Sequence, residues 1–113
     1  MRYEEIPAID LLAAEAGIAS GVPSQIADAL VRASLSPIDP AWVEAACLRS
    51  LAQSDFEVQW AALSALGHLA RRYRRLDTGA VLAVVQPLRD NPALAGKVGD
   101  LLDDIDTYVT APS

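Results

Sequence analysis

Few side chains of this 113-residue chain are of a type that could support nucleophilic catalysis: Cys47, His68 and the aspartates. A cysteine attacks as its thiolate, usually with a nearby histidine as the base. No motif surrounds either residue, and Cys47 lies in an apolar run, which is typical of a small buried side chain. One histidine and one cysteine are also too few for a zinc site. We therefore expect no enzyme activity, no catalytic residue, no metal and no cofactor.

Gly96 and Gly99 have the spacing of a short glycine-rich loop. A phosphate loop would follow a strand and carry a P-loop pattern, and neither accompanies this pair. The pair instead lies within an amphipathic helical pattern. We expect these glycines to weaken that helix or to let a neighbouring element approach closely.

The net charge of −6 is unevenly distributed along the chain. Segments 1–48 and 77–113 carry −5 and −4, whereas segment 49–76 carries +3. A nucleic-acid-binding domain has a basic footprint, so we expect no nucleic-acid partner. The acidic balance is compatible with a basic protein partner, but most acidic proteins are simply soluble.

Two charged clusters and one aromatic residue are the candidate partner-binding residues. Arg71 and Arg72 share a polar helical face with His68, and Arg74 and Arg75 follow them. The acidic cluster belongs to the last expected helix: Asp100, Asp103, Asp104 and Asp106. Either the arginines pair with neighbouring acids and stabilise the end of their own helix, or they form a ligand site. The acids could in turn face a basic partner, which would speed association.

Trp60 completes the candidate set, and Trp42 is the other tryptophan. Each could fill the groove between neighbouring helices, which we favour. Each could instead be an exposed anchor for a partner, since tryptophan is enriched among the residues that dominate binding energy.

Proline, glycine and capping residues divide the chain into six expected helices. Asp10, Ser24, Asp55 and Asp77 stand where N-caps are expected, and Pro40 follows Asp39 as a first-turn proline. The expected helices cover 10–19, 24–35, 40–51, 54–76, 81–88 and 92–108, between an extended lead-in at 1–8 and a tail at 110–113. Segment 81–88 is valine-rich and could be a strand. We favour a helix that Pro87 kinks or ends.

Apolar residues recur at helical spacing in each segment. The positions expected to face the core include Leu11, Leu12, Ala16 and Ile18 in the first helix, and Val43, Ala46, Cys47, Ser50 and Leu51 in the third. Matching patterns begin at Ile26, Val58 and Leu94, at intervals in the thirties. Such a period is typical of an α-solenoid built of helix pairs, and a helical bundle is the alternative.

The segment DFEVQWAALSALGHLA resembles the second helix of a HEAT repeat. The matching positions are Asp55, Val58, Ala61, Ala62, Ala65, Leu66, Gly67 and Leu69. Gln59 stands where the repeat usually has arginine, so the ion pair between repeats is not expected here. The resemblance implies an all-α, right-handed solenoid of about three antiparallel helix pairs in a single domain over 1–113.

The whole chain further resembles a group of small bacterial HEAT-like proteins. The shared elements are the lead-in at 6–10, GHLAR at 67–71, Leu76-Asp77 and LLDDID at 101–106, followed by Tyr108-Val109. Proteins of this group often occur beside polymorphic toxins of contact-dependent inhibition systems and are regarded as their immunity proteins. The resemblance implies a protein that binds and neutralises the C-terminal domain of a cognate toxin, basic and nuclease-like in chemistry.

Two other functions remain open: a HEAT adaptor, scaffold or lyase-accessory protein without a toxin partner, and a nucleic-acid repair module like the larger HEAT-type glycosylases. The short length and the acidity of the chain oppose a nucleic-acid repair module.

The N-terminus has no signal-peptide pattern, and no apolar run approaches the length of a membrane span. We therefore expect a cytoplasmic protein that does not insert into membranes and is monomeric when free.

Overall fold

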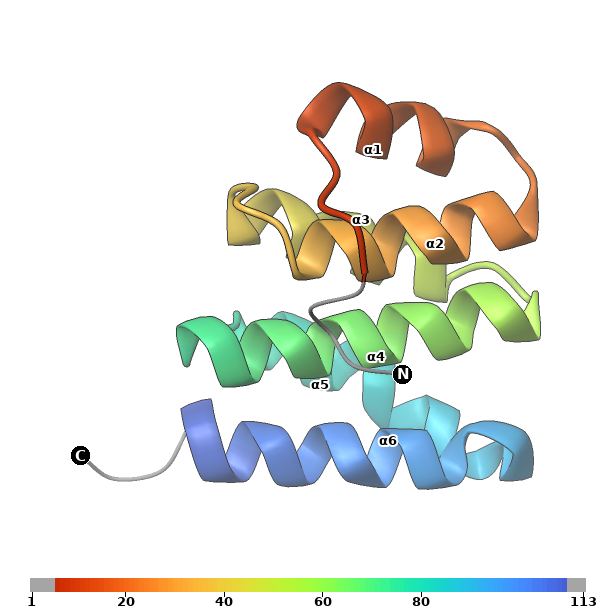
Figure 1. Cartoon of the computed structure of the whole chain (residues 1–113). Coiled ribbons are helices and arrows are strands. Elements are labelled where there is room, and N and C mark those ends of the chain that lie inside the picture. The colour runs from red at the N-terminus through yellow and green to blue at the C-terminus, as the bar shows by residue number, and fades with distance from the viewer. Residues whose placement is uncertain (1–5, 110–113) are drawn as a thin grey trace.

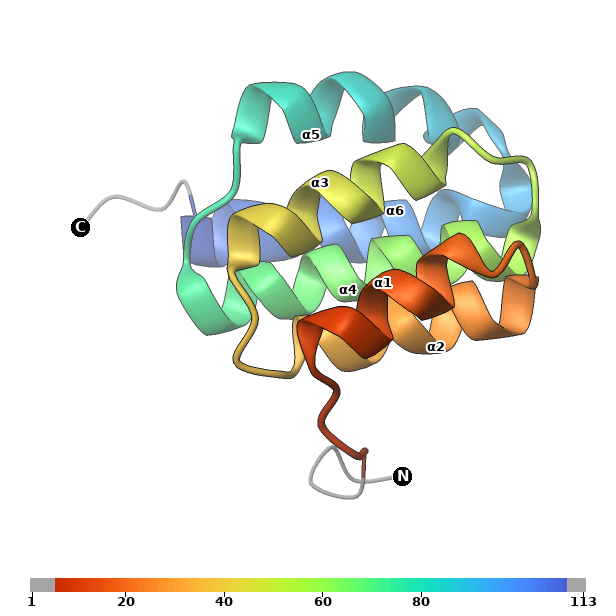
Figure 2. The same cartoon turned by 90° about the horizontal axis from the view of Figure 1, so that it is seen from above.

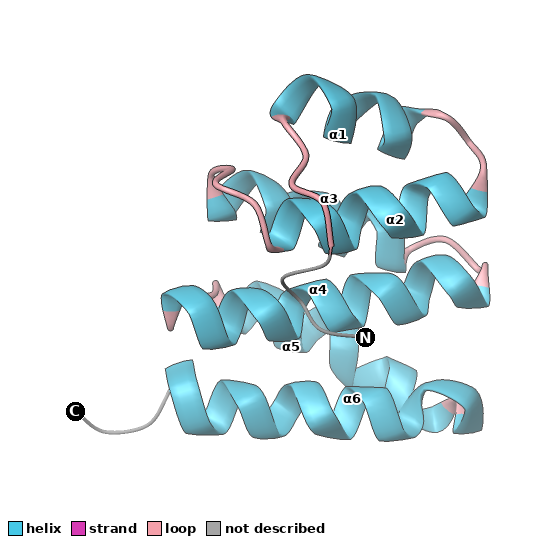
Figure 3. Ribbon diagram, viewed as in Figure 1, coloured by secondary structure: helices cyan, strands magenta, loops and turns pink. Residues whose placement is uncertain are grey.

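The computed structural model describes residues 6–109, and within that range the chain is all-helical, with no strand (Figure 3). The α-helices are α1 (Leu11–Ala19), α2 (Pro23–Ser34), α3 (Pro40–Leu51), α4 (Phe56–Tyr73), α5 (Thr78–Val85) and α6 (Pro92–Asp104). A 3-10 helix at Gln86–Asp90 and a π-helix at Ile105–Val109 follow α5 and α6. The expectations for residues 1–5 and 110–113 lie outside the described residues. No helix within 6–109 has the length and apolar character needed to cross a membrane.

Short polar side chains begin five of the six helices. Those that accept a hydrogen bond from a first-turn backbone N–H are Asp10, Asp39, Asp55, Asp77 and Asn91. The expected cap at Ser24 is wrong, because α2 begins at Pro23, directly after Val22, without a side-chain cap. Proline suits this first position, since it has no N–H group that needs a partner.

The helices form two layers. Helices α2, α4 and α6 lie side by side in one layer, with α1 over α2 at one end (Figure 1). Helices α3 and α5 lie on one side of that layer (Figure 2). Helix α4 packs against α2, α3 and α6, so it contacts helices of both layers.

Small side chains let the neighbours of α4 approach closely. Its alanines at 61, 62, 65 and 70 are all buried. Gly67 shows the closeness most directly: a Cβ there would lie 3.1 Å from an Asp104 carboxylate oxygen. The middle of α4 is therefore buried, and its exposed side chains lie towards its two ends: Phe56, Glu57 and Trp60 at the start, Arg71 and Arg72 at the end.

The expected inward face of α1 is wrong at Leu11, Leu12 and Ala16, whereas Ile18 packs against the core as expected. Leu11 and Leu12 are 44% and 78% exposed, and Ala14 is the buried residue of the helix. Helix α1 packs mainly against α2, through a contact so close that a Cβ on Gly17 would lie 2.8 Å from the Ala29 Cβ. At the end of the stack only one side of α1 is covered, so its leucines point elsewhere.

The two C-terminal segments, 78–90 and 92–109, are helical, as the sequence predicts. Segment 78–85 is a helix that gives way to a 3-10 helix containing Pro87, which removes a helical N–H donor. Helix α6 ends as an α-helix at Asp104 and continues as a wider π turn to Val109. Gly96 and Gly99 have no atom within 4 Å of an added Cβ, so no neighbour approaches closely there.

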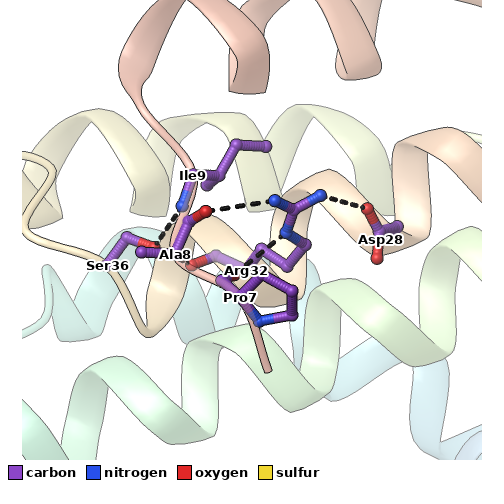
Figure 4. Close-up of polar contacts among 6 residues, drawn as sticks. All are labelled: Pro7, Ala8, Ile9, Asp28, Arg32 and Ser36. Atoms are coloured by element: carbon purple, nitrogen blue, oxygen red, sulfur yellow. Dashed lines mark hydrogen bonds and ion pairs between the residues drawn. The ribbon is translucent and has the colours of Figure 1, made fainter. Parts of the chain in front are cut away.

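The lead-in at 6–10 is tied to α2 by polar contacts (Figure 4). Arg32 donates hydrogen bonds to the carbonyl oxygens of Pro7 and Ala8 at 3.0 and 3.1 Å and pairs with Asp28 at 3.1 Å. The backbone N–H of Ile9 donates to the Ser36 hydroxyl at 3.0 Å. These contacts hold an extended segment along the outside of α2, next to α4.

Candidate protein-binding face

His68, Arg71 and Asp104 form one polar network between α4 and α6. Arg71 donates from one guanidinium nitrogen to Asp104 at 2.5 Å and from another to the His68 Nδ1 at 2.8 Å. An arginine donates only, so Nδ1 accepts and the ring proton lies on Nε2. The network fixes the orientation of the Arg71 side chain across the gap between the two helices.

His68 is buried, with 7% of its surface exposed. Its burial lowers its pKa to about 4, with smaller effects from the positive charges of Arg71, Lys97 and Arg72. The imidazole is therefore neutral at physiological pH, as the hydrogen bond from Arg71 requires. Two of the expected partner-binding residues, His68 and Arg71, thus take part in the polar network that joins α4 to α6.

Arg72 also has structural contacts. Its guanidinium donates to the backbone carbonyls of Ser34 and Ser36, at 2.7 and 3.4 Å, where α2 ends. It also lies 4.9 Å from the centroid of the Tyr73 ring. A cation near the last carbonyls of a helix is electrostatically favourable, and here it stabilises the end of a neighbouring helix.

Cys47 is fully buried. Burial, and to a smaller extent the charge of Glu44, raises the pKa of its thiol far above the usual range. The side chain therefore stays protonated at neutral pH and packs as a small apolar group. No set of three His, Cys, Asp or Glu side chains within 6–109 is grouped as a metal site would require.

A polar groove of about 560 Å³ runs between α4 and α6. It brings together Asp100, Asp103 and Asp104 of the expected acidic cluster with His68 and Arg71 of the basic one. The remaining lining residues are Leu63, Ser64, Gly67, Lys97 and Leu101. Asp106 is not among the residues that line it, because it lies in the π turn after α6.

Trp60 stands at the surface of α4 and does not fill the space between helices. Its side chain is 42% exposed and forms a tilted ring pair with Phe56, which is 49% exposed, at a centroid distance of 5.5 Å. Lys97 of α6 places its ammonium 5.0 Å from the Trp60 ring centroid. Trp42, by contrast, is partly buried and packs against the core.

A second groove, of about 590 Å³, lies between α2 and α4, and Trp60 is among its lining residues. Ile6 and Pro7 of the lead-in contribute to its wall, together with Val31 and Ala61. Ser64 and His68 line both grooves, so they form the ridge between them.

The sequence reasoning missed Phe56 and Lys97 as parts of this face. The signal for Phe56 was available, because it lies four residues before Trp60 and therefore one helical turn away. The position of Lys97 depends on how α6 packs against α4, which no local pattern reveals.

The chain is similar to one chain of a solved structure described as a CDI (contact-dependent inhibition) complex from Cupriavidus taiwanensis. The two share 28% sequence identity and superpose with a TM-score of 0.79, over 96% of this chain and 97% of the other. No protein family model matches the chain, and no curated protein matches it in sequence.

Proposed function

We propose that this protein is an immunity protein of a contact-dependent inhibition system, which binds and neutralises a cognate toxin domain. The observation that carries the proposal is the similarity to a chain of the CDI complex, which extends over nearly the full length of both chains. Partner binding is the shared property that such a similarity supports most directly.

The chemistry of the described residues favours binding over catalysis. The one cysteine is a buried thiol, and the one histidine is neutral and bonded to Arg71. An immunity protein needs neither a nucleophile nor a cofactor, because covering the active site or an essential surface of the toxin is sufficient. The net charge of −6 suits a basic, nuclease-like toxin, for which it would raise the association rate.

We further infer that the fold is a short, HEAT-like solenoid of three helix pairs. The support is the single layer of α2, α4 and α6, which are the second helices of the proposed pairs (Figure 1). In a solenoid each pair contacts its neighbours, and the row of second helices offers an extended binding surface. The proposal places the protein in the cytoplasm, where it would meet an incoming toxin.

A protection assay tests this function. The toxin domain encoded beside the gene of this chain is expressed in a bacterium with and without this protein. The proposal predicts growth arrest by the toxin alone and normal growth when both are present. Absence of an adjacent toxin gene, or unchanged arrest in the presence of the protein, would contradict the proposal and favour a HEAT adaptor or scaffold.

A further inference from the structure

Phe56 and Trp60 form an exposed aromatic pair on the surface of α4. A ring pair with 49% and 42% exposure is costly for a protein to leave in water, and tryptophan is prominent among binding anchors. The other exposed large apolar residues within 6–109 are aliphatic and lie at the α1 end: Leu11, Leu12 and Val22. The aromatic pair is therefore the strongest anchor among the described residues.

The recesses beside the pair can receive side chains of a partner. One groove lies between α4 and α6, the other between α2 and α4, and each measures several hundred Å³. Ser64, one turn after Trp60, lies on the ridge that separates them and donates its hydroxyl to the Trp60 carbonyl. A partner that covers Trp60 would thus reach the groove that Trp60 lines and, across Ser64, the groove between α4 and α6.

The charges on this face indicate the chemistry of the partner. Two of its cations have charged or polar partners within the chain: Arg32 holds Asp28 and the lead-in, and Arg71 holds His68 and Asp104. Lys97 lies over the neutral Trp60 ring, which leaves its positive charge uncompensated. Its remaining carboxylates are Glu57, Asp100 and Asp103. Across residues 6–109, no hydrogen bond or ion pair engages these three side chains. Three carboxylates against the one ammonium of Lys97 leave the face with a net negative charge, so the complementary surface is basic.

We propose that the partner docks on the face formed by Phe56, Trp60 and the flanking carboxylates Glu57, Asp100 and Asp103. The partner is a basic protein surface that places an apolar side chain against the aromatic pair and arginine or lysine side chains against the carboxylates. The identity of the partner as a toxin rests on the proposed function. The surface itself follows from exposure, shape and charge, and it excludes Arg72 and the outer side of α1.

Binding kinetics of three variants test the surface, with the toxin domain encoded beside the gene of this chain as the probe. Trp60→Ala removes the anchor and is expected to accelerate dissociation about tenfold or more. Asp100→Asn with Asp103→Asn is expected to slow association about tenfold at low salt and to reduce its salt dependence. Ser64→Arg places a long side chain on the ridge, and it should weaken binding without removing a core side chain.

Matched control variants carry the same chemical changes elsewhere. Leu12→Ala removes an exposed apolar side chain from α1, and Glu15→Gln with Asp90→Asn removes two exposed charges away from this face. Both controls should bind like the unmodified protein, and thermal unfolding should show that every variant is folded.

The outcomes separate the surface from the function. If the unmodified protein binds the toxin and the three test variants bind equally well, the proposed surface is wrong and the function stands. If Leu12→Ala loses binding instead, the interface lies at the α1 end of the stack. If the unmodified protein does not bind, the proposed function and this inference both fall.

Discussion

At the scale of single residues, His68 accepts a hydrogen bond from Arg71 on the ring nitrogen that would be protonated in acid. Its lowered pKa of about 4, against an ordinary value of 6.5, means that the folded protein resists this protonation. In the unfolded chain the same ring takes up a proton below about pH 6.5. The free energy of unfolding therefore decreases as the pH falls from 6.5 towards 4.

We predict that His68→Gln removes this pH dependence. Glutamine keeps an acceptor for Arg71 but cannot be protonated, so the contribution of His68, on the order of 3 kcal/mol between pH 6.5 and 4, disappears. Urea unfolding at a series of pH values measures it. Subtracting the free energy of unfolding of the variant from that of the unmodified protein at each pH removes the contributions of the titrating groups that both share. Parallel stability curves for both proteins would show that His68 is not protected from protonation.

Arg72 provides a second prediction at this scale. Arg72→Met should destabilise the protein by about 1–3 kcal/mol, because the backbone carbonyls of Ser34 and Ser36 lose a charged donor. Arg75→Met is the matched control and should change the stability by less than about 0.5 kcal/mol. Chemical unfolding at neutral pH gives both values. Equal effects of the two substitutions would mean that the contact of Arg72 with α2 contributes nothing specific.

At the scale of elements, the contact between α1 and α2 depends on Gly17. Gly17→Ala would place a Cβ 2.8 Å from the Ala29 Cβ, so α1 must move and the protein should lose about 1–3 kcal/mol of stability. Gly96→Ala, where nothing lies within 4 Å of the new Cβ, should instead raise the stability by about 0.5–1 kcal/mol. Thermal unfolding distinguishes them, and a stable Gly17→Ala variant would refute the close contact.

The sequence predicted where the helices lie better than it predicted which side of each helix is buried. Helical spacing, capping aspartates and Pro87 were sufficient for six helices and for the inward face of α3, where all five expected residues are buried. It failed for three of the four expected positions in α1, because that helix is apolar on several sides and only packing decides which side is covered. Ser24 was a wrong cap because Pro23 had already begun the helix.

The candidate site was less predictable than the helices. Asp103 and Arg71 each belong to a recognisable charge cluster, but the meeting of the two clusters in one groove depends on the packing of α4 against α6. The exposure of Trp60 has the same origin. Helical periodicity places a residue on a face, whereas the tertiary contacts decide whether that face meets a neighbour or water.

At the scale of the whole molecule, we predict that the free protein is a monomer of 12.0 kDa. The uncovered end of α1 offers only a short aliphatic surface, and a net charge of −6 makes two copies repel each other. Sedimentation velocity at micromolar concentration measures the mass. A stable dimer that Leu12→Lys dissociates would contradict the prediction and identify the outer side of α1 as a self-association surface.

The central claim is that this protein acts by binding a toxin, and an inhibition titration tests it most directly. The purified toxin domain encoded beside the gene is assayed while the protein is added in increasing amounts. We predict that toxin activity falls linearly and reaches its minimum when the two are present in equal amounts. Toxin activity that is unaffected by a molar excess of the folded protein would contradict the claim.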